Sequence, residues 1–311
     1  MNFGKALPGE SKILDYILPP DPGLTVKTLS GGKTDMPLKA YVGCAKWGAK
    51  EWVGQIYPPK SKEFLTEYVK HFNAIELNTT FYQMPTPGLV QSWKEKAIEN
   101  PDFLFCPKIP QSITHTRRLK NAERLTEEFY SAISAFGQNL GPILLQLNER
   151  FSYKSYDDLK DYIHYLPKHT PVFVELRHHH WFDRSDVRKR VFELLAEYNI
   201  GAAISDTALR RNCIHMTLPT SNAFIRFVGN GDVTDFHRLD DWVLRIKQWR
   251  DLGLHNLYFF IHQSEDKKAP VVADYLIKRL NDKLGITLRG RSSCPIKLRY
   301  YSMSYRFNNL I

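Results

Sequence analysis

Short apolar runs alternate with longer amphipathic segments along most of the chain. The runs are five to seven residues long and are rich in β-branched and aromatic residues, which is typical of buried strands. They predict eight strands, at residues 41–45, 74–78, 103–108, 143–147, 171–177, 201–205, 223–228 and 257–262.

Segments with helical periodicity separate these strands. In the clearest one, Leu125, Phe129, Ile133 and Phe136 recur at intervals of three and four residues. Helices are predicted at 61–72, 88–98, around 125–136, 156–166, 185–198, 239–250 and 269–284, the last ending before a C-cap glycine, Gly285. Residues 206–221 lack a long amphipathic pattern, so we expect the helix after the sixth strand to be short or missing.

This alternation predicts an α/β fold, the TIM (β/α)8 barrel, at roughly its typical 250-residue size. A doubly wound sheet is the alternative, but no G-x-G-x-x-G follows the first strand. Residues 1–38 hold five prolines and a Gly-Gly pair without sustained periodicity, which predicts an extended N-terminal lead-in. The predicted barrel domain spans 39–285, and a basic tail covers 286–311.

Composition excludes several classes of protein. The 311 residues are 43% hydrophobic and 24% charged, as in ordinary globular proteins. The apolar runs are too short to cross a bilayer, and the first residues lack the apolar stretch of a signal peptide. The four cysteines, Cys44, Cys106, Cys213 and Cys294, form no C-x-x-C pair. We therefore expect a cytoplasmic protein without a membrane span, a disulfide framework or structural zinc.

The net charge of +10 is concentrated at the C-terminal end of the chain. From residue 283 onward six residues are basic and none is acidic, so the rest of the chain is much closer to neutral. A basic tail with interleaved aromatic residues can follow a phosphate backbone. Nucleic acid or a nucleotide is therefore an alternative partner, and a tail folded loosely on the barrel is the structural alternative.

Polar residues collect at the predicted carboxyl ends of the strands, where TIM barrels carry their reactive groups. They are Lys46, Glu76, Asn78, Lys108, Gln146, Glu175, Arg177, Asp206, Arg226 and His262. Side chains at i and i+2 share a face of a strand, so Glu76 with Asn78, and Glu175 with Arg177, are expected to point into the barrel. A structural network of ion pairs, such as Glu175 with Lys108, is the alternative to a site.

Several motifs resemble a known family. The stretches YVGCAKWGAKEWVGQIYP, HFNAIELNTTFYQMP, FCPKIPQSITHTRRL, GPILLQLNERF and VFVELRHHHWF carry E-x-N-x-T-F-Y at 76–82, K-x-P at 108–110 with T-H at 114–115, and E-x-R-H at 175–178 with Trp181. In order and spacing they resemble the YecE-like family, domain of unknown function 72, over about residues 40–282. The resemblance implies a TIM barrel and, because the family has no established activity, no particular reaction.

Acid–base or nucleophilic chemistry is the first candidate for the strand ends. Glu175 is the preferred general base or nucleophile, with Glu76 or Asp206 as its carboxylate partner. Lys108, Arg177 and Arg226 supply positive charge that can hold an anion. The histidines His115 and His178 are candidates for moving a proton.

Other residues are candidates for ligand contacts. Gly229 and Gly231 follow the seventh strand, where glycine-rich loops of this fold often bring backbone N–H groups to phosphate. Three aromatic residues suit stacking against a sugar or a base: Trp47, Tyr82 and Trp181. Asn78, Gln146 and His262 complete the ligand-binding set. The triplet at 178–180 is suggestive of metal, but neighbouring residues alternate sides and are not expected to share one ion. No cofactor is predicted; a divalent metal held by strand-end carboxylates and imidazoles is an alternative.

These observations predict a hydrolase or related enzyme acting on a small anionic or phosphate-bearing ligand at the barrel mouth. The alternative is a non-catalytic protein that binds nucleic acid or a nucleotide through the same cationic mouth and the basic tail.

Overall fold

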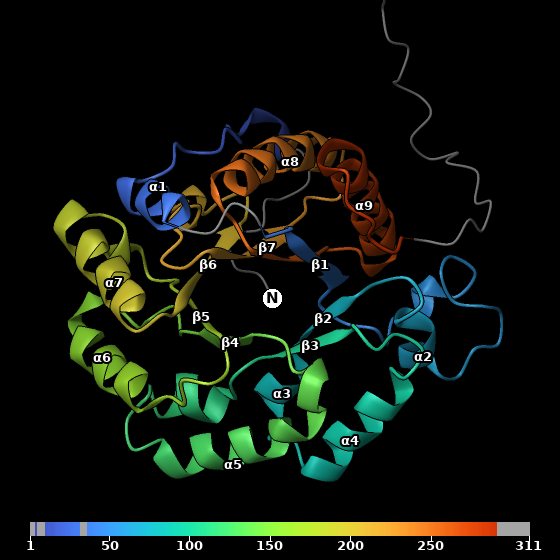
Figure 1. Cartoon of the computed structure of the whole chain (residues 1–311), viewed down its shortest axis with the longest axis horizontal. Coiled ribbons are helices and arrows are strands. Elements are labelled where there is room, and N and C mark those ends of the chain that lie inside the picture. Colours follow the sequence, from blue (N-terminus) through green and yellow to red (C-terminus); the bar gives the residue numbers. More distant parts are fainter. Residues whose placement is uncertain (1–3, 5–9, 32–35, 291–311) are drawn as a thin grey trace, which may run out of the picture.

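Eight parallel strands form a barrel at the centre of the molecule (Figure 1). The computed structural model describes residues 4, 10–31 and 36–290. The strands are β1 Lys39–Cys44, β2 Ala74–Leu77, β3 Leu104–Pro107, β4 Ile143–Gln146, β5 Val172–Glu175, β6 Gly201–Asp206, β7 Asn222–Val228 and β8 Asn256–His262. They pair in the order β3-β2-β1-β8-β7-β6-β5-β4, which confirms the predicted TIM-barrel topology.

The seam between β3 and β4 nearly closes the barrel. Two isolated bridges span this seam: Phe105 of β3 pairs with Leu140, which precedes β4, and Lys108, which follows β3, pairs with Leu144 of β4. The Ile109 N–H also donates to the Leu144 carbonyl at 3.0 Å. The end of every strand is therefore held near its neighbours, and the strand ends form one mouth.

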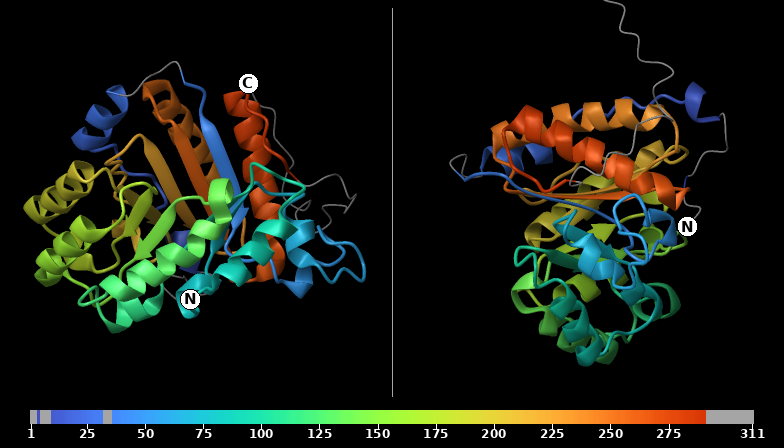
Figure 2. Two further views of the ribbon diagram at one scale, coloured as in Figure 1. Left: turned by 60° about the horizontal axis from the view of Figure 1, so that its bottom comes forward. Right: turned by 90° about the vertical axis from the view of Figure 1, so that its right-hand side faces the viewer.

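Helices surround the barrel, and α8 and α9 lie side by side on its outside (Figure 2). Their bounds are α1 Gly23–Ser30, α2 Phe64–Tyr68, α3 Thr79–Tyr82, α4 Pro87–Lys96, α5 Glu123–Ile133, α6 Tyr156–Tyr165, α7 Ser185–Glu197, α8 Thr234–Leu252 and α9 Ala269–Leu284. After β6 there is a single 3-10 turn, Arg211–Cys213, so the expected short helix is confirmed. Gly285 ends α9 in the left-handed conformation, at φ 64°, as predicted.

The N-terminal lead-in is not extended throughout, and the prediction is wrong for α1. Pro22 precedes the first turn of this helix, and its buried residues are Thr25 and Leu29. Thr25 donates from its hydroxyl to the carbonyl of Met216 at 2.8 Å. A helix of eight residues with so few buried positions is too short to give a clear period. Cys294 and most of the predicted basic tail lie outside the described residues.

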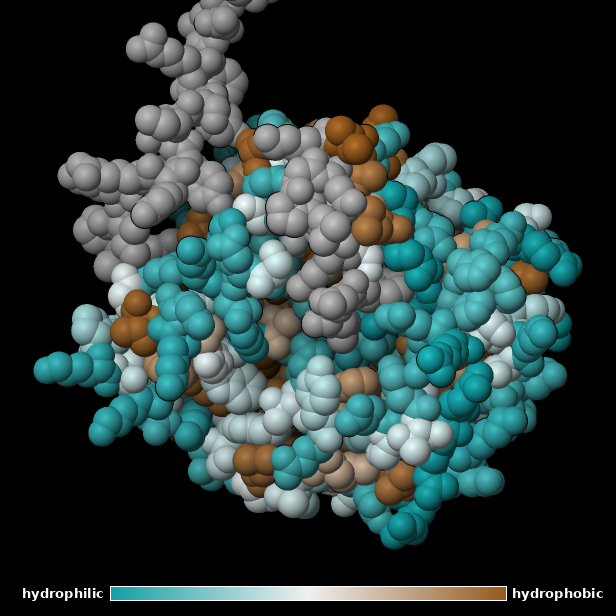
Figure 3. Space-filling model, turned by 180° about the vertical axis from the view of Figure 1, so that it is seen from behind, coloured by the Kyte–Doolittle hydropathy of each residue, from teal (hydrophilic) through white to brown (hydrophobic). Residues whose placement is uncertain are grey.

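Buried apolar side chains form two layers. The larger cluster lies between the strands and the helices, and it includes Ile75, Leu77, Val174 and Leu176. A smaller inner cluster fills the barrel itself. On the face seen in Figure 3, hydrophobic residues appear as small separate groups among hydrophilic ones. Among the described helices, none combines the length and apolar character needed to cross a bilayer.

Candidate functional site

Polar side chains form a ring inside the barrel near the carboxyl ends of seven strands. This polar ring consists of Glu76, Lys108, Gln146, Glu175, Ser205, Arg226 and His262. Each member lies two residues after a member of the inner apolar layer, Ala74, Cys106, Leu144, Phe173, Ala203, Phe224 and Phe260. Because side chains two residues apart share a face, the barrel interior changes from apolar to polar at its last step before the mouth.

Arg226 joins the two glutamates of the polar ring. Its Nε and Nη2 donate to the two carboxylate oxygens of Glu76 at 2.8 Å each, and its Nη1 donates to Oε1 of Glu175 at 2.8 Å. Asn78 Nδ2 donates to Glu76 at 3.0 Å, and His262 Nε2 lies 3.0 Å from the same carboxylate. Burial opposes ionisation of Glu76, but Arg226 and His262 outweigh it and hold its pKa well below the usual value. Both Glu76 oxygens are therefore fully occupied.

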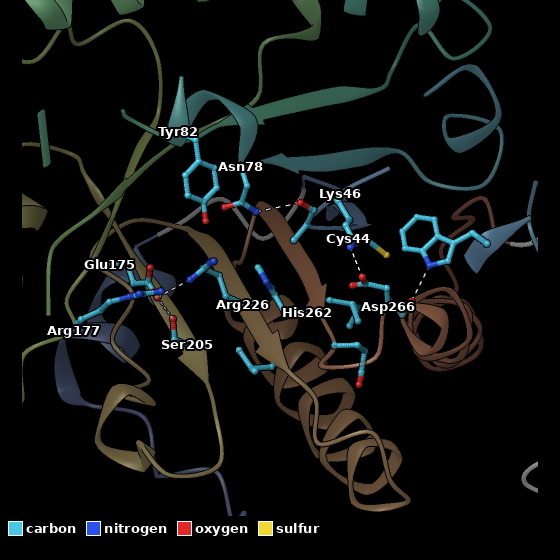
Figure 4. A pocket seen from close by; sticks show the side chains of 16 residues that line it. Cys44, Lys46, Asn78, Tyr82, Glu175, Arg177, Ser205, Arg226, His262 and Asp266 are labelled. Atoms are coloured by element: carbon cyan, nitrogen blue, oxygen red, sulfur yellow. Dashed lines mark hydrogen bonds and ion pairs between the residues drawn. The ribbon is translucent and has the colours of Figure 1, made fainter. Parts of the chain in front are cut away.

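Glu175 uses its two carboxylate oxygens differently. Its Oε1 accepts from Arg226, from Arg177 Nη2 at 3.3 Å and from Ser205 Oγ at 2.5 Å, as Figure 4 shows. Its buried Oε2 has no hydrogen-bond partner among the described residues. Burial raises the pKa of Glu175, but Arg177, Arg226 and Ser205 outweigh it and bring the pKa to about 2. The group is thus ionised at neutral pH, with one oxygen held and the other unused.

Lys108 is fully buried on the neighbouring side of the polar ring. Its Nζ lies 3.9 Å from the centre of the Phe81 ring and, within the described chain, has no hydrogen-bond partner. Burial, reinforced by Arg226, lowers the pKa of Lys108 to about 7. Oε1 of Gln146 on the next strand is also buried without a partner among the described residues.

A pocket of about 320 Å³ opens above the polar ring. Its polar lining consists of Lys46, Asn78, Tyr82, Glu175, Arg177, Ser205, Arg226, His262, Gln263 and Asp266 (Figure 4). Lys46 forms an ion pair with Asp266, and the Tyr82 side chain is exposed. Glu76, Lys108 and Gln146 are not part of this lining. We call this cavity the mouth pocket.

Comparisons with known proteins place the chain in a family. A model described as "Protein of unknown function DUF72" matches residues 41–293. The chain belongs to the DUF72 family. It is similar to UPF0759 protein YecE of Escherichia coli (strain K12), at 28% identity over 263 residues, covering 78% of this chain and 93% of YecE. UPF0759 protein YunF of Bacillus subtilis (strain 168) is 28% identical over 156 residues, covering 46% of this chain and 52% of YunF.

Solved structures agree on the fold. The crystal structure of a DUF72 family protein, EF0366 from Enterococcus faecalis V583, superposes with a TM-score of 0.62 at 16% identity, covering 80% of this chain and 98% of that one. A second structure of the same protein gives a TM-score of 0.63 at 14% identity. The family model and the similarity to YecE confirm the resemblance to the YecE-like family inferred from the motifs.

Asp206 of this DUF72 chain does not join the mouth pocket, contrary to the prediction. Its carboxylate is 2.7 Å from Arg238 Nη2 and accepts from Arg211 Nη1 at 2.6 Å and from Trp242 Nε1 at 2.8 Å. The inward position on β6 belongs to Ser205, one residue earlier, so alternation turns Asp206 toward α8. It is a buried structural carboxylate rather than a partner for Glu175.

Trp181 also lies away from the mouth pocket. Its ring is completely buried, and its indole Nε1 donates to the Phe151 carbonyl at 2.7 Å. It packs between the rings of Phe151 and Tyr153. The prediction that it stacks on a ligand is wrong, because the side chain anchors the loop after β5 in the core.

The glycine loop after β7 is already occupied by a carboxylate of the chain. The N–H groups of Asn230 and Gly231 donate to Asp235, at 2.7 and 2.9 Å. The Gly229 N–H donates to the His262 carbonyl at 2.8 Å. These amides are not available to a phosphate, so the structure does not bear out the predicted role of Gly229 and Gly231.

Two histidines of the predicted set lie beside the site rather than in the pocket lining. His115 packs edge-on against Phe81, at 4.9 Å between ring centres, and burial together with Lys108 lowers its pKa to about 4. His178 belongs to the turn after β5, where it groups with His179 and His180. One ligand atom of each of these three lies within 4.8 Å of the other two. The expectation that neighbouring histidines point apart is wrong, because a 3-10 turn replaces the extended strand there.

The sequence prediction missed three polar lining residues, Ser205, Gln263 and Asp266. Ser205 lies two residues after Ala203 of the inner layer, so alternation along β6 could have identified it. Gln263 directly follows the eighth predicted strand, so its place at the mouth was detectable. Lys46, placed at the end of the first strand from the sequence, does lie on the lining. Asp266 lies four residues beyond β8, and no local pattern marks its pairing with Lys46.

Proposed function

We propose that the mouth pocket is the active site of a hydrolase or related enzyme, with Glu175 as its catalytic carboxylate and a small anion as its substrate. The observation that supports this proposal is the asymmetry of Glu175: three donors hold Oε1, whereas Oε2 has no partner among the described residues. A buried unpaired carboxylate oxygen is costly to a fold. Reaction with, or stabilisation of, an electron-poor atom would give that oxygen a function.

The protonation state of Glu175 limits its role. With a pKa of about 2, it is a weak general base and is not protonated near neutral pH. This favours a nucleophile, or a fixed negative charge that stabilises a developing cation, over the general base predicted from sequence. Arg226 and Ser205 would hold the carboxylate in position during such a reaction.

The charge of the site favours a singly charged substrate. Among the buried groups, Glu76 and Glu175 balance Arg177 and Arg226, and Arg226 already directs three N–H groups at carboxylates. Lys108 then decides whether this buried set is neutral or carries one positive charge. A carboxylate-sized monoanion suits this balance better than a phosphate dianion, for which the loop amides after β7 are also occupied. Arg177, on the pocket lining, is the proposed anion contact.

A thermal-shift screen of the full-length protein tests the anion. We expect glycolate, pyruvate or glucuronate to raise the melting temperature, and glycerol 3-phosphate and glucose 6-phosphate to have smaller effects. A ligand at 100 times its dissociation constant adds about 2.7 kcal/mol of stability. Arg177→Met should abolish the shift, whereas Arg188→Met, at an exposed arginine of α7, should retain it. A larger shift with phosphates, or none with any compound, would overturn the proposed substrate class.

The catalytic role needs its own measurement. Hydrolysis of a 4-nitrophenyl glycoside that keeps its free carboxylate, such as 4-nitrophenyl glucuronide, should fall at least 100-fold in Glu175→Gln, while binding of free glucuronate changes little. Unchanged turnover would remove Glu175 from the mechanism even if the thermal-shift screen supports the proposed anion. Nucleic-acid binding stays a sequence-based alternative, because residues 291–311 lie outside the described residues.

A further inference from the structure

Three consecutive histidines, His178, His179 and His180, follow β5 outside the mouth pocket. Their ring centres are 4.3 to 4.6 Å apart, and one ligand nitrogen of each lies within 4.8 Å of the other two. We propose that they form a binding site for a divalent transition-metal ion. Imidazole nitrogen is a preferred ligand of Zn²⁺, Ni²⁺ and Cu²⁺ but not of Mg²⁺ or Ca²⁺.

The fold holds the three rings together without any ion. The 3-10 turn His179–Trp181 is anchored by the buried indole of Trp181, which donates to the Phe151 carbonyl at 2.7 Å. The Phe182 N–H closes the turn by donating to the His179 carbonyl at 2.8 Å. Because the backbone is fixed, a metal ion would have to order only side chains, and this lowers the entropic cost of binding.

His179 has the partner that metal-binding imidazoles usually have. Its Nδ1 lies 2.7 Å from a carboxylate oxygen of Asp183. A carboxylate on one ring nitrogen fixes the proton there and leaves the lone pair of the other nitrogen for the metal. Asp183 is four residues further along, and its N–H donates to the His179 carbonyl at 3.2 Å. This arrangement assigns Nε2 of His179 as a ligand atom.

His178 is the weakest of the three ligands. Its Nδ1 accepts from the His180 N–H at 3.0 Å, so it must change tautomer or give up this bond to bind a metal. We therefore expect His179 and His180 to supply most of the affinity. Water would fill the remaining positions, as in open zinc sites.

Titration of the untagged, chelator-treated full-length protein with Co²⁺ tests this proposal. Visible absorption and competition with a chromophoric chelator should report one tight equivalent of Co²⁺, displaced by Zn²⁺. We expect His179→Ala and His180→Ala each to weaken binding at least tenfold, with smaller losses in His178→Ala and Asp183→Asn. All three histidine changes are at partly or fully exposed positions, and circular dichroism would verify their folding.

A matched control separates this site from general surface binding. His237 is an exposed histidine on α8, so His237→Ala should keep the wild-type affinity. Nitrogen couplings in the electron paramagnetic resonance spectrum of the Cu²⁺-loaded protein should decrease in His179→Ala. The proposal is overturned if the wild-type protein binds no Co²⁺, or if the double variant His179→Ala/His180→Ala binds it as tightly as the wild type.

Discussion

Replacing the buried Lys108 by methionine is expected to stabilise the fold at neutral pH. The ammonium has no hydrogen-bond partner among the described residues, and burial lowers its pKa from 10.5 to about 7. At 1.36 kcal/mol per unit, that shift corresponds to about 5 kcal/mol of destabilisation when the amine is protonated. Methionine has a similar length, fills the space beside Phe81 and carries no charge. We expect a gain of roughly 2–4 kcal/mol at pH 7, because imperfect repacking offsets part of the difference.

The sign of the pH dependence follows from proton binding. Between pH 7 and about 10.5 the unfolded chain keeps the Lys108 proton while the folded chain releases it. Unfolding is then linked to proton uptake, so this group makes the wild-type protein more stable as the pH rises through that window. Below pH 7 both states are protonated and the destabilisation is at its full value. The advantage of Lys108→Met should therefore be largest at or below pH 7 and shrink toward pH 10.

Urea denaturation of both proteins at pH 7 and pH 9.5 measures this difference. Lys247→Met is the matched control, since Lys247 is exposed on α8, and its stability should change by no more than about 0.5 kcal/mol. The reasoning is refuted if Lys108→Met is less stable than the wild type at pH 7. It is also refuted if the advantage stays the same at pH 9.5.

Three further predictions concern the buried carboxylates. Arg226→Met leaves Glu76 and Glu175 without their main partner and should lower the urea-derived free energy of unfolding by about 3–5 kcal/mol; a loss below 1 kcal/mol would contradict the network. Because the pKa of Glu175 is depressed to about 2, its contribution of roughly 3 kcal/mol is complete above pH 4.5 and lost as the pH falls from 4.5 toward 2. The free energy of unfolding of Glu175→Gln should not show this decrease between pH 4.5 and 2. If its pH dependence is parallel to that of the wild type, the contribution assigned to Glu175 is wrong. Asp206→Asn should destabilise the protein by about 1–3 kcal/mol, because it weakens the contact with Arg238. Its affinity for a carboxylate that binds in the mouth pocket, measured by calorimetry, should not change. A tenfold weaker affinity would show that Asp206 contributes to the site.

Alternation along the strands made much of the barrel interior predictable. Glu76 and Glu175 were expected to point inward, and both do, because apolar neighbours at i−1 and i+1 pack against the helices. The same rule identifies Ser205 as the inward residue of β6 and excludes Asp206. Asp206 was predicted as a site residue because it lies near the strand end, without regard to which face of the strand it occupies. The eight-residue helix α1 escaped prediction for a different reason, since its stability comes from tertiary contacts more than from its own pattern.

The pairing of residues far apart in the chain could not be predicted from the sequence, because no local pattern specifies it. Arg226 lies 150 residues from Glu76 and 51 from Glu175, and only the closure of the barrel brings them together. Asp235, which occupies the loop amides after β7, is nearer in sequence, yet its contact depends on how α8 begins. Both Arg226 and the loop amides after β7 were predicted to bind an anionic ligand, but these pairings already occupy them.

The pairing of inward charges with one another has a general physical basis in barrel folds. Charged residues at inward positions face one another across a small, water-poor interior, where an unpaired charge is far more costly than on the surface. Most inward charges are therefore expected to pair with one another, and counting cations at strand ends overestimates what is available to a ligand. The informative groups are those that pairing leaves over, here the Lys108 ammonium and Oε2 of Glu175. Their cost to stability is measurable in Lys108→Met, and a stabilised variant that no longer binds the carboxylate probes would link that cost to function.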